Sequence, residues 1–218
     1  MQISIPQEHV IPLIENINKT AKKYSYGQEK HKIIIQDLLG NEIINFRLPL
    51  NISYPEYDKN DINYIILLIQ SGSCSLGMYE DGINVDHKVF KSYMVRKKQG
   101  KSQIKYLKTK GKSRAGSRVR LGNTVEFFEN INHRLQEYFD NWTVNRIAMS
   151  CSKILIPYLF NSKVQCPFSK KDDRIYKIPK HIETPNHEVL NNVNRFLLKG
   201  HLMYNEENQD LVDEILDI

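Results

Sequence analysis

A Gly-x-x-Gln motif, Gly100-Lys101-Ser102-Gln103, is the feature of this sequence best suited to chemistry. A glutamine amide both donates and accepts hydrogen bonds, so it can order a water molecule without titrating. Its backbone N–H can also stabilise a developing oxyanion. Such groups suit the hydrolysis of an ester that is already activated. The alternative, which the motif alone leaves open, is that Gln103 is an ordinary exposed loop residue.

The motif lies in a segment with a strongly one-sided charge. Between His87 and Val125 there is no Asp or Glu, whereas Lys88–Arg120 holds 13 of the 31 Lys and Arg residues. The other 18 basic residues face 25 acids, so the rest of the chain carries about −7 although the formal net charge is +6. A local concentration of positive charge predicts binding to a polyanion such as an RNA backbone. A solvated loop without a partner is the alternative.

Other catalytic motifs are missing from the sequence. It has no P-loop, GxSxG, HExxH or GxGxxG pattern, and its histidines and cysteines do not have the spacing of metal ligands. We therefore expect neither a metal nor a cofactor. A two-metal nuclease is an alternative that would use acids at presumed turns and strand ends, where capping explains them equally well. These acids are Asp37, Asp58, Asp61, Asp81 and Asp86.

Three unpaired cysteines, Cys74, Cys151 and Cys166, indicate a reducing compartment. The N-terminus lacks the pattern of a signal peptide, and the sequence contains no run of about 18 apolar residues that could cross a membrane. We expect a cytoplasmic protein, without membrane contact and monomeric.

The first half of the chain predicts one helix followed by strands. Residues 6–23 have an amphipathic helical pattern. The runs 31–37 and 42–48 predict a hairpin. The most hydrophobic run, 62–70, predicts a central buried strand. Two more strands are expected at 73–79, towards the sheet edge, and at 87–95.

The second half begins with a predicted long basic loop at about 96–122. Asn123-Thr124-Val125-Glu126 has the pattern of a helix N-cap, and the following helix has an aromatic stripe typical of a core. Residues 153–159 and 174–178 predict strands. A last helix is expected from Thr184-Pro185, with Gly200 closing it.

These elements predict an α/β (α+β) fold with a mixed sheet flanked by helices. We expect one domain over residues 1–200. Residues 201–218 are expected to form an acidic tail, either a frayed helix or a partner-binding end.

The chain resembles the release-factor-like domain of the VMS/ANKZF family in four segments. These are HKVFKSYMVRKKQGKSQ, KSRAGSRVRLGN with the helix after it, YIILLIQSGSCSLGMYEDG, and DRIYKIPKHIETPNHEVLNNVNRFLL. The resemblance spans roughly residues 60–200. Members are peptidyl-tRNA hydrolases of ribosome-associated quality control, distantly similar to the GGQ domain of class-one release factors.

The resemblance implies a ribonuclease-H-like sheet, a stand-alone member of bacterial type, and action on peptidyl-tRNA in the large ribosomal subunit. It implies that Gln103 is catalytic, with Gly100 permitting the loop conformation and Ser102 orienting it. Where the family usually has small residues before the glutamine, this chain has Lys101.

On this hypothesis two sets of basic residues contact RNA. The acceptor-end lysines, expected to hold the acceptor-end phosphates, are Lys97, Lys98, Lys101 and Lys105. Residues expected to contact tRNA or ribosomal backbone are Lys110, Lys112, Arg114, Arg118 and Arg120. Two alternatives remain: a non-catalytic RNA- or ribosome-binding module, and a ribonuclease-H-like nuclease that cuts near the tRNA acceptor end.

Overall fold

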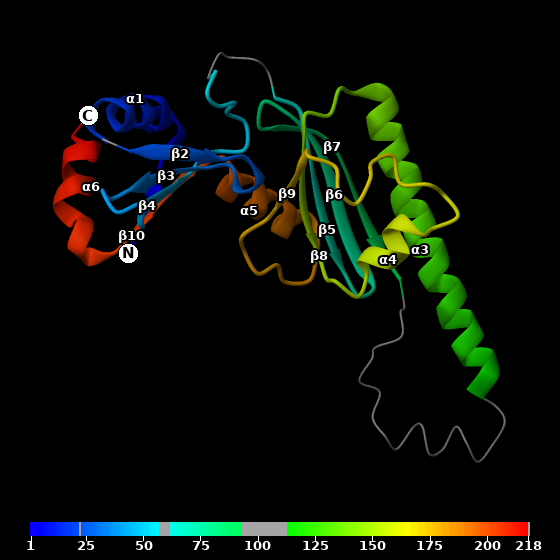
Figure 1. Ribbon diagram of the computed structural model, residues 1–218. Helices are drawn as coiled ribbons and strands as arrows, with labels where there is room; N and C mark the ends of the chain where they lie inside the picture. Colours follow the sequence, from blue (N-terminus) through cyan, green and yellow to red (C-terminus); the bar gives the residue numbers. More distant parts are fainter. Residues whose placement is uncertain (22, 57–61, 93–112, 218) are drawn as a thin grey trace.

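The computed structural model describes residues 1–21, 23–56, 62–92 and 113–217, and for residues 113–121 only the backbone is described. The chain builds two five-stranded sheets (Figure 1). The first sheet has the order β1-β10-β4-β3-β2, from β1 (Gln2–Ile5), β10 (Gly200–Tyr204), β4 (Glu42–Arg47), β3 (Lys32–Gln36) and β2 (Tyr24–Gly27). The second has the order β7-β6-β5-β8-β9, from β7 (Ile83–Lys91), β6 (Ser73–Glu80), β5 (Tyr64–Gln70), β8 (Arg146–Cys151) and β9 (Ile175–Lys177).

The first sheet is antiparallel throughout and joins the two ends of the chain. Helices α1 (Val10–Thr20) and α6 (Gln209–Leu216) contact each other and share one core with the sheet. Short 3-10 turns precede three elements, at Gln7–His9, Gln28–Lys30 and Glu206–Asn208. Burial of the apolar stripe of each helix against alternating strand residues stabilises this half.

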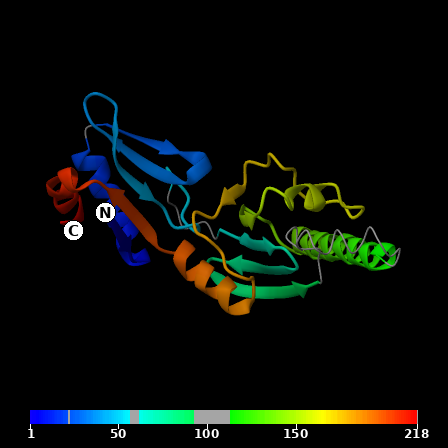
Figure 2. The same ribbon diagram turned by 90° about the horizontal axis from the view of Figure 1, so that it is seen from below.

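The second sheet is mixed. β5, β6 and β7 form an antiparallel meander, and β8 and β9 extend it in parallel with β5. Helices α3 (Ser113–Asn141) and α4 (Ile156–Phe160) lie on one face and α5 (His187–Leu197) on the other (Figures 1 and 2). The predicted α+β fold with a mixed sheet flanked by helices is confirmed.

Several predicted elements are confirmed. The helix within 6–23 is α1, the hairpin is β3–β4, and the hydrophobic run 62–70 contains β5, which is central and has six of its seven residues buried. The aromatic stripe of the long helix belongs to the core. The helix predicted from Thr184-Pro185 is α5, with Asn186 as its N-cap, whose side chain accepts from the N–H of Val189.

Three expectations are wrong. The long helix begins at Ser113 and not at residue 123, because ten more residues continue the helical hydrogen bonding. Residues 153–159 are not a strand: they lead into α4, with Pro157 in its first turn, and the strand is β8, one step earlier in the chain. Gly200 does not close α5, since it begins β10.

The segment expected to form an acidic tail, 201–218, contains most of β10 and all of α6, which belong to the first sheet and its core. Leu202 pairs between β1 and β4, and Val212 and Ile215 of α6 are fully buried. Many acidic residues of this segment lie on the polar side of an amphipathic helix, and its apolar side packs inward. Within the described ranges, every helix is too short or too polar to span a lipid bilayer.

Candidate functional site

The basic segment, Lys88–Arg120, connects a strand of the second sheet to the helix that packs on that sheet. It begins on β7, an edge strand, and ends on α3. The Ser92 N–H donates to the carbonyl of Gly72 at 2.9 Å, and the Ser92 hydroxyl donates to the carbonyl of Asn123 at 3.1 Å. The second bond joins the end of β7 to α3, so it fixes the two stems of the basic segment relative to each other.

Most of the predicted site residues lie outside the described residues. They are Gly100, Ser102 and Gln103, with Lys97, Lys98, Lys101, Lys105, Lys110 and Lys112. Their roles therefore stay predictions.

Arg114, Arg118 and Arg120 are on the first turns of α3, not in a loop. Positions 114 and 118 are four apart and lie one turn from each other on the same helix face, whereas position 120 is on another face. The first turn of α3 contains no acid, and a helix N-terminus carries partial positive charge. Figure 1 shows this part of α3 (green) projecting past the sheet. The charge of these arginines is therefore carried on a regular helix.

The remainder of α3 anchors this basic end to the sheet. Phe128, Ile131 and Leu135 are buried in the core of the second half. Arg134 forms ion pairs with Asp86 of β7 and with Glu137 one turn further along α3, and its guanidinium lies over the ring of Tyr138, 5.2 Å from the centroid. The ion pair with Asp86 ties α3 directly to the strand that begins the basic segment.

Three of the five aspartates considered for a nuclease site have structural partners. Asp37 accepts from the backbone and side chain of Asn41, both at 2.8 Å, and these bonds hold its pKa below the usual range. Asp81 accepts from Asn51 at 3.3 Å in the β6–β7 turn, and Asp86 pairs with Arg134. Asp58 and Asp61 lie outside the described residues. In the described part of the chain, no three His, Cys, Asp or Glu residues are grouped so as to hold a metal.

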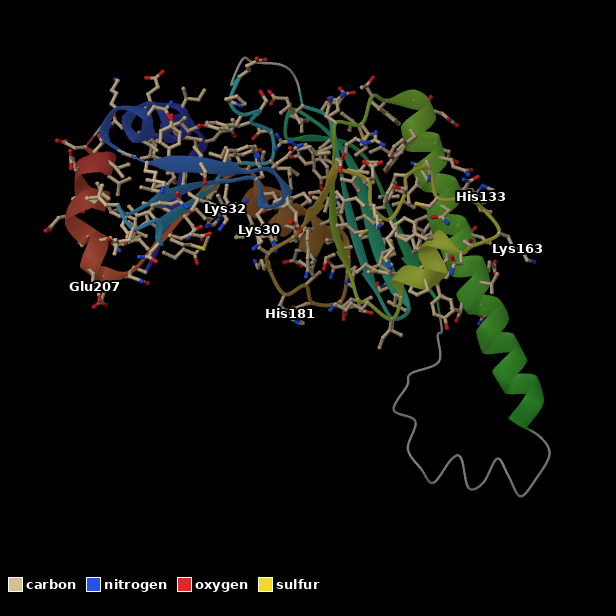
Figure 3. The ribbon with its side chains drawn as sticks, viewed as in Figure 1. Lys30, Lys32, His133, Lys163, His181 and Glu207 are labelled. Atoms are coloured by element: carbon tan, nitrogen blue, oxygen red, sulfur yellow. The ribbon has the colours of Figure 1, made fainter. Side chains whose placement is uncertain are left out.

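The acidic residues of the C-terminal segment lie far from the basic end of α3. From Gly200 to Ile218 the chain has six acids and no Lys or Arg. In Figure 3, Glu207 is at the end of the molecule that α6 occupies, whereas His133 and Lys163 are beside α3 and α4. The two ends thus differ in charge, which favours an orientation in which the α3 end approaches a polyanion.

Sequence reasoning missed the polar residues at the junction of the two sheets. Arg47 is 4% exposed, and its Nη2 donates to the carbonyls of Phe196 and Lys199, at 3.0 and 2.8 Å. It therefore satisfies carbonyls at the C-terminal end of α5, where a cation is favoured. His31 is also buried, between Tyr26 and the carbonyl of Pro49. The one signal in the sequence was a charged residue closing an apolar strand run, which does not reveal a partner about 150 residues away.

The comparisons with known proteins include a family match that covers the second sheet and the basic segment. Residues 64–205 match the family described as the Bacteroidetes VLRF1 release factor. A solved structure entitled "Vms1 mitochondrial localization core" is similar at 10% identity, with 91% of this chain and 82% of that chain covered and a TM-score of 0.46. No curated protein matches.

The matched segment defines a release-factor-like protein. The chain belongs to the Bacteroidetes VLRF1 release factor family. The family supports a release-factor-like role in ribosome quality control, with interaction with ribosome and tRNA and hydrolase activity in general.

Proposed function

We propose that this protein hydrolyses the ester of peptidyl-tRNA in stalled ribosomal complexes, with Gln103 as the catalytic residue. The observation that carries the proposal is the Gly-x-x-Gln motif within an acid-free basic segment. The stems of that segment are joined by the Ser92–Asn123 hydrogen bond. Membership in a release-factor family supports the same reading.

In the proposed reaction a water molecule attacks the carbonyl carbon that links the peptide to the terminal ribose. The Gln103 amide orders this water, and its backbone N–H stabilises the oxyanion of the tetrahedral intermediate. The bond from carbon to the ribose oxygen then breaks, and a proton from the water passes to that oxygen. The products are a peptide with a free carboxyl group and an intact tRNA with a free 3′ hydroxyl. The mechanism uses no metal or cofactor.

The basic segment binds the substrate through its phosphates. The acceptor-end lysines surround Gln103 in sequence, and the arginines of α3 follow on a helix that extends past the sheet. Phosphate contacts position RNA without reading its bases. The protein therefore acts on the common acceptor end of tRNA, whatever the peptide or the anticodon.

The direct test is peptide release from purified ribosome–nascent-chain complexes. Gln103→Ala should bind ribosomes and melt like the wild type, because an exposed loop substitution changes stability by less than about 0.5 kcal/mol. Its release rate should fall on the order of 10²–10³-fold, the usual effect of losing one oxyanion donor. Gln7→Ala, which changes an exposed glutamine on the first half of the molecule, is the matched control.

Both products should be resolved in this assay. Wild-type release by Gln103→Ala would identify a ribosome-binding module in which the glutamine is incidental. Shortened tRNA would instead identify the nuclease alternative.

A further inference from the structure

A groove lies at the junction of the two sheets, and no described residue of the basic segment lines it. It encloses about 440 Å³, a size common for small-molecule sites. Its walls come from β2 and the turn after it, from residues 53–55, and from the starts of β8 and β9. Three tyrosines and two arginines line it: Tyr26, Tyr54, Tyr176, Arg146 and Arg174.

Arg146 presents an unused donor in this groove. Its Nη2 donates to the carbonyl of Ile52 at 2.8 Å, whereas its Nη1 is buried and has no hydrogen-bond partner among the described residues. Within that same part of the chain, no carboxylate forms an ion pair with Arg146. Burial lowers the pKa of Arg146, but a guanidinium remains charged at neutral pH. A buried cation without a counter-charge is costly, and an anionic ligand would offset that cost.

Arg174, in the same groove, already has a counter-charge. Its Nε and Nη2 donate to the carboxylate of Asp172 at 2.9 and 2.8 Å, and its Nη1 donates to the carbonyl of Val144 at 3.1 Å. Its guanidinium also lies over the ring of Phe139. Of the two arginines that line the groove, Arg146 is the one without a counter-charge among the described residues.

The tyrosines beside Arg146 offer flat apolar surface. The rings of Tyr26 and Tyr54 are 4.8 Å apart between centroids, tilted by 42°, and both side chains are partly exposed. The Tyr26 hydroxyl and Nδ1 of His31 are 2.6 Å apart, and Nε2 of His31 is 2.9 Å from the carbonyl of Pro49. Since that carbonyl only accepts, Nε2 carries the proton and Nδ1 accepts from Tyr26. His31 therefore holds the Tyr26 ring in place as a neutral group, and burial lowers its pKa to about 3.

We propose that this groove binds a nucleotide with a single phosphate. The phosphate is attracted to the guanidinium of Arg146 and the base lies against Tyr26 and Tyr54, since aromatic faces stack on any base. The exposed carboxylates of Glu29 and Asp173 also line the groove, where they accept from ribose hydroxyls and repel additional phosphates. The same chemistry is found in a free mononucleotide and at the end of an RNA strand.

The test is a titration of the full chain with adenosine 5′-monophosphate, followed by calorimetry or by chemical-shift changes. The wild type should bind it, and should bind inorganic phosphate and adenosine triphosphate at least tenfold more weakly. Arg146→Gln should lower the affinity for adenosine 5′-monophosphate at least tenfold. Arg174→Gln, the matched control that removes a guanidinium from the same groove, should change its affinity less than threefold.

Arg146 also contacts Ile52, so a second variant keeps the test decisive if Arg146→Gln fails to fold. Tyr54→Ala should reduce the affinity for the monophosphate to that for inorganic phosphate. The proposal is overturned if the wild type shows no binding at millimolar ligand, if inorganic phosphate binds equally well, or if neither variant weakens the monophosphate.

Two further arms identify the source of the nucleotide and its relation to Gln103. If a single-stranded RNA trinucleotide displaces the monophosphate, the ligand of the groove is the end of an RNA strand. If it does not, the ligand is a free mononucleotide. The Gln103→Ala protein should bind the monophosphate like the wild type, which separates this site from peptide release. Loss of binding in that variant would contradict a separate site.

Discussion

Replacing glycine by alanine should have opposite effects at Gly122 and Gly200. Gly122 is exposed within α3, and a Cβ there would have no heavy atom within 4 Å. Gly200 is the buried first residue of β10. A Cβ there would be 2.8 Å from Cε2 of Phe46 and 3.2 Å from Cβ of Ile5. Neither glycine has the positive φ that favours glycine, so the two sites differ in space and not in backbone strain.

The magnitudes follow from these surroundings. In a helix interior, alanine is favoured over glycine by about 1 kcal/mol. For a chain of this length that raises the melting temperature by about 2–4 °C. At Gly200 the added methyl must displace Phe46, which is fully buried. Overpacking of this kind costs about 1–3 kcal/mol and lowers the melting temperature by about 2–12 °C.

Thermal and urea unfolding, followed by circular dichroism, measure both variants against the wild type. Gly122→Ala also tests the corrected start of α3, because the gain exists only if position 122 is helical. A Gly122→Ala protein no more stable than the wild type would refute the helical extension that carries Arg114, Arg118 and Arg120. An unchanged Gly200→Ala protein would refute the close packing of β10 on β4.

Three other outcomes are expected. Replacing the four acceptor-end lysines together should flatten the dependence of log affinity for tRNA on log salt by up to about 3–4 units, whereas an equal loss of charge elsewhere should not. The unfolded chain takes up a proton on His31 near pH 6.5, whereas the folded chain takes it up only near pH 3. The free energy of unfolding should therefore decrease as the pH is lowered from about 6.5 towards 3. His31→Asn, which tolerates the left-handed backbone at this position, should reduce that fall when urea midpoints at pH 7 and 5 are compared. Arg47→Met should lower the free energy of unfolding by about 1–3 kcal/mol, because it removes the guanidinium donor to the carbonyls of Phe196 and Lys199.

The matched control for the lysine variant removes four exposed lysines that lie elsewhere on the chain. These are Lys19, Lys153, Lys170 and Lys171. An equal effect of the two variants would mean that net charge, and not the basic segment, determines the affinity.

Local patterns in the sequence predicted much of the second sheet. The run at 64–70 is apolar at nearly every position because β5 is covered on both faces, and such a run is readable without any knowledge of its partners. The α3 stripe is readable for the same reason, since Phe128, Ile131 and Leu135 recur at helical spacing. The start of α3 could not be predicted from the sequence, because Gly116 and Gly122 weaken the helical pattern there.

The first sheet could not be predicted in the same way. β10 pairs with β1 across about 200 residues, and no local pattern records such a partner. The α6 segment was read as a tail because its acids dominate its composition, although Val212 and Ile215 are fully buried. Likewise the junction groove brings together Tyr26, Tyr54 and Arg146 from three distant stretches, so it exists only once both sheets are formed.

The path of the chain shows why the two sheets act as one framework. The segment that matches the release-factor family ends at residue 205, beyond β10, and so inside the first sheet. β10 has its hydrogen-bonding partners in β1 and β4, and its Leu202 is buried in the core shared with α1. The end of the matched segment is therefore incomplete without residues from the N-terminal part of the chain. Since Arg47 of β4 also caps α5, the orientation of the first sheet is coupled to the sheet from which the basic segment extends.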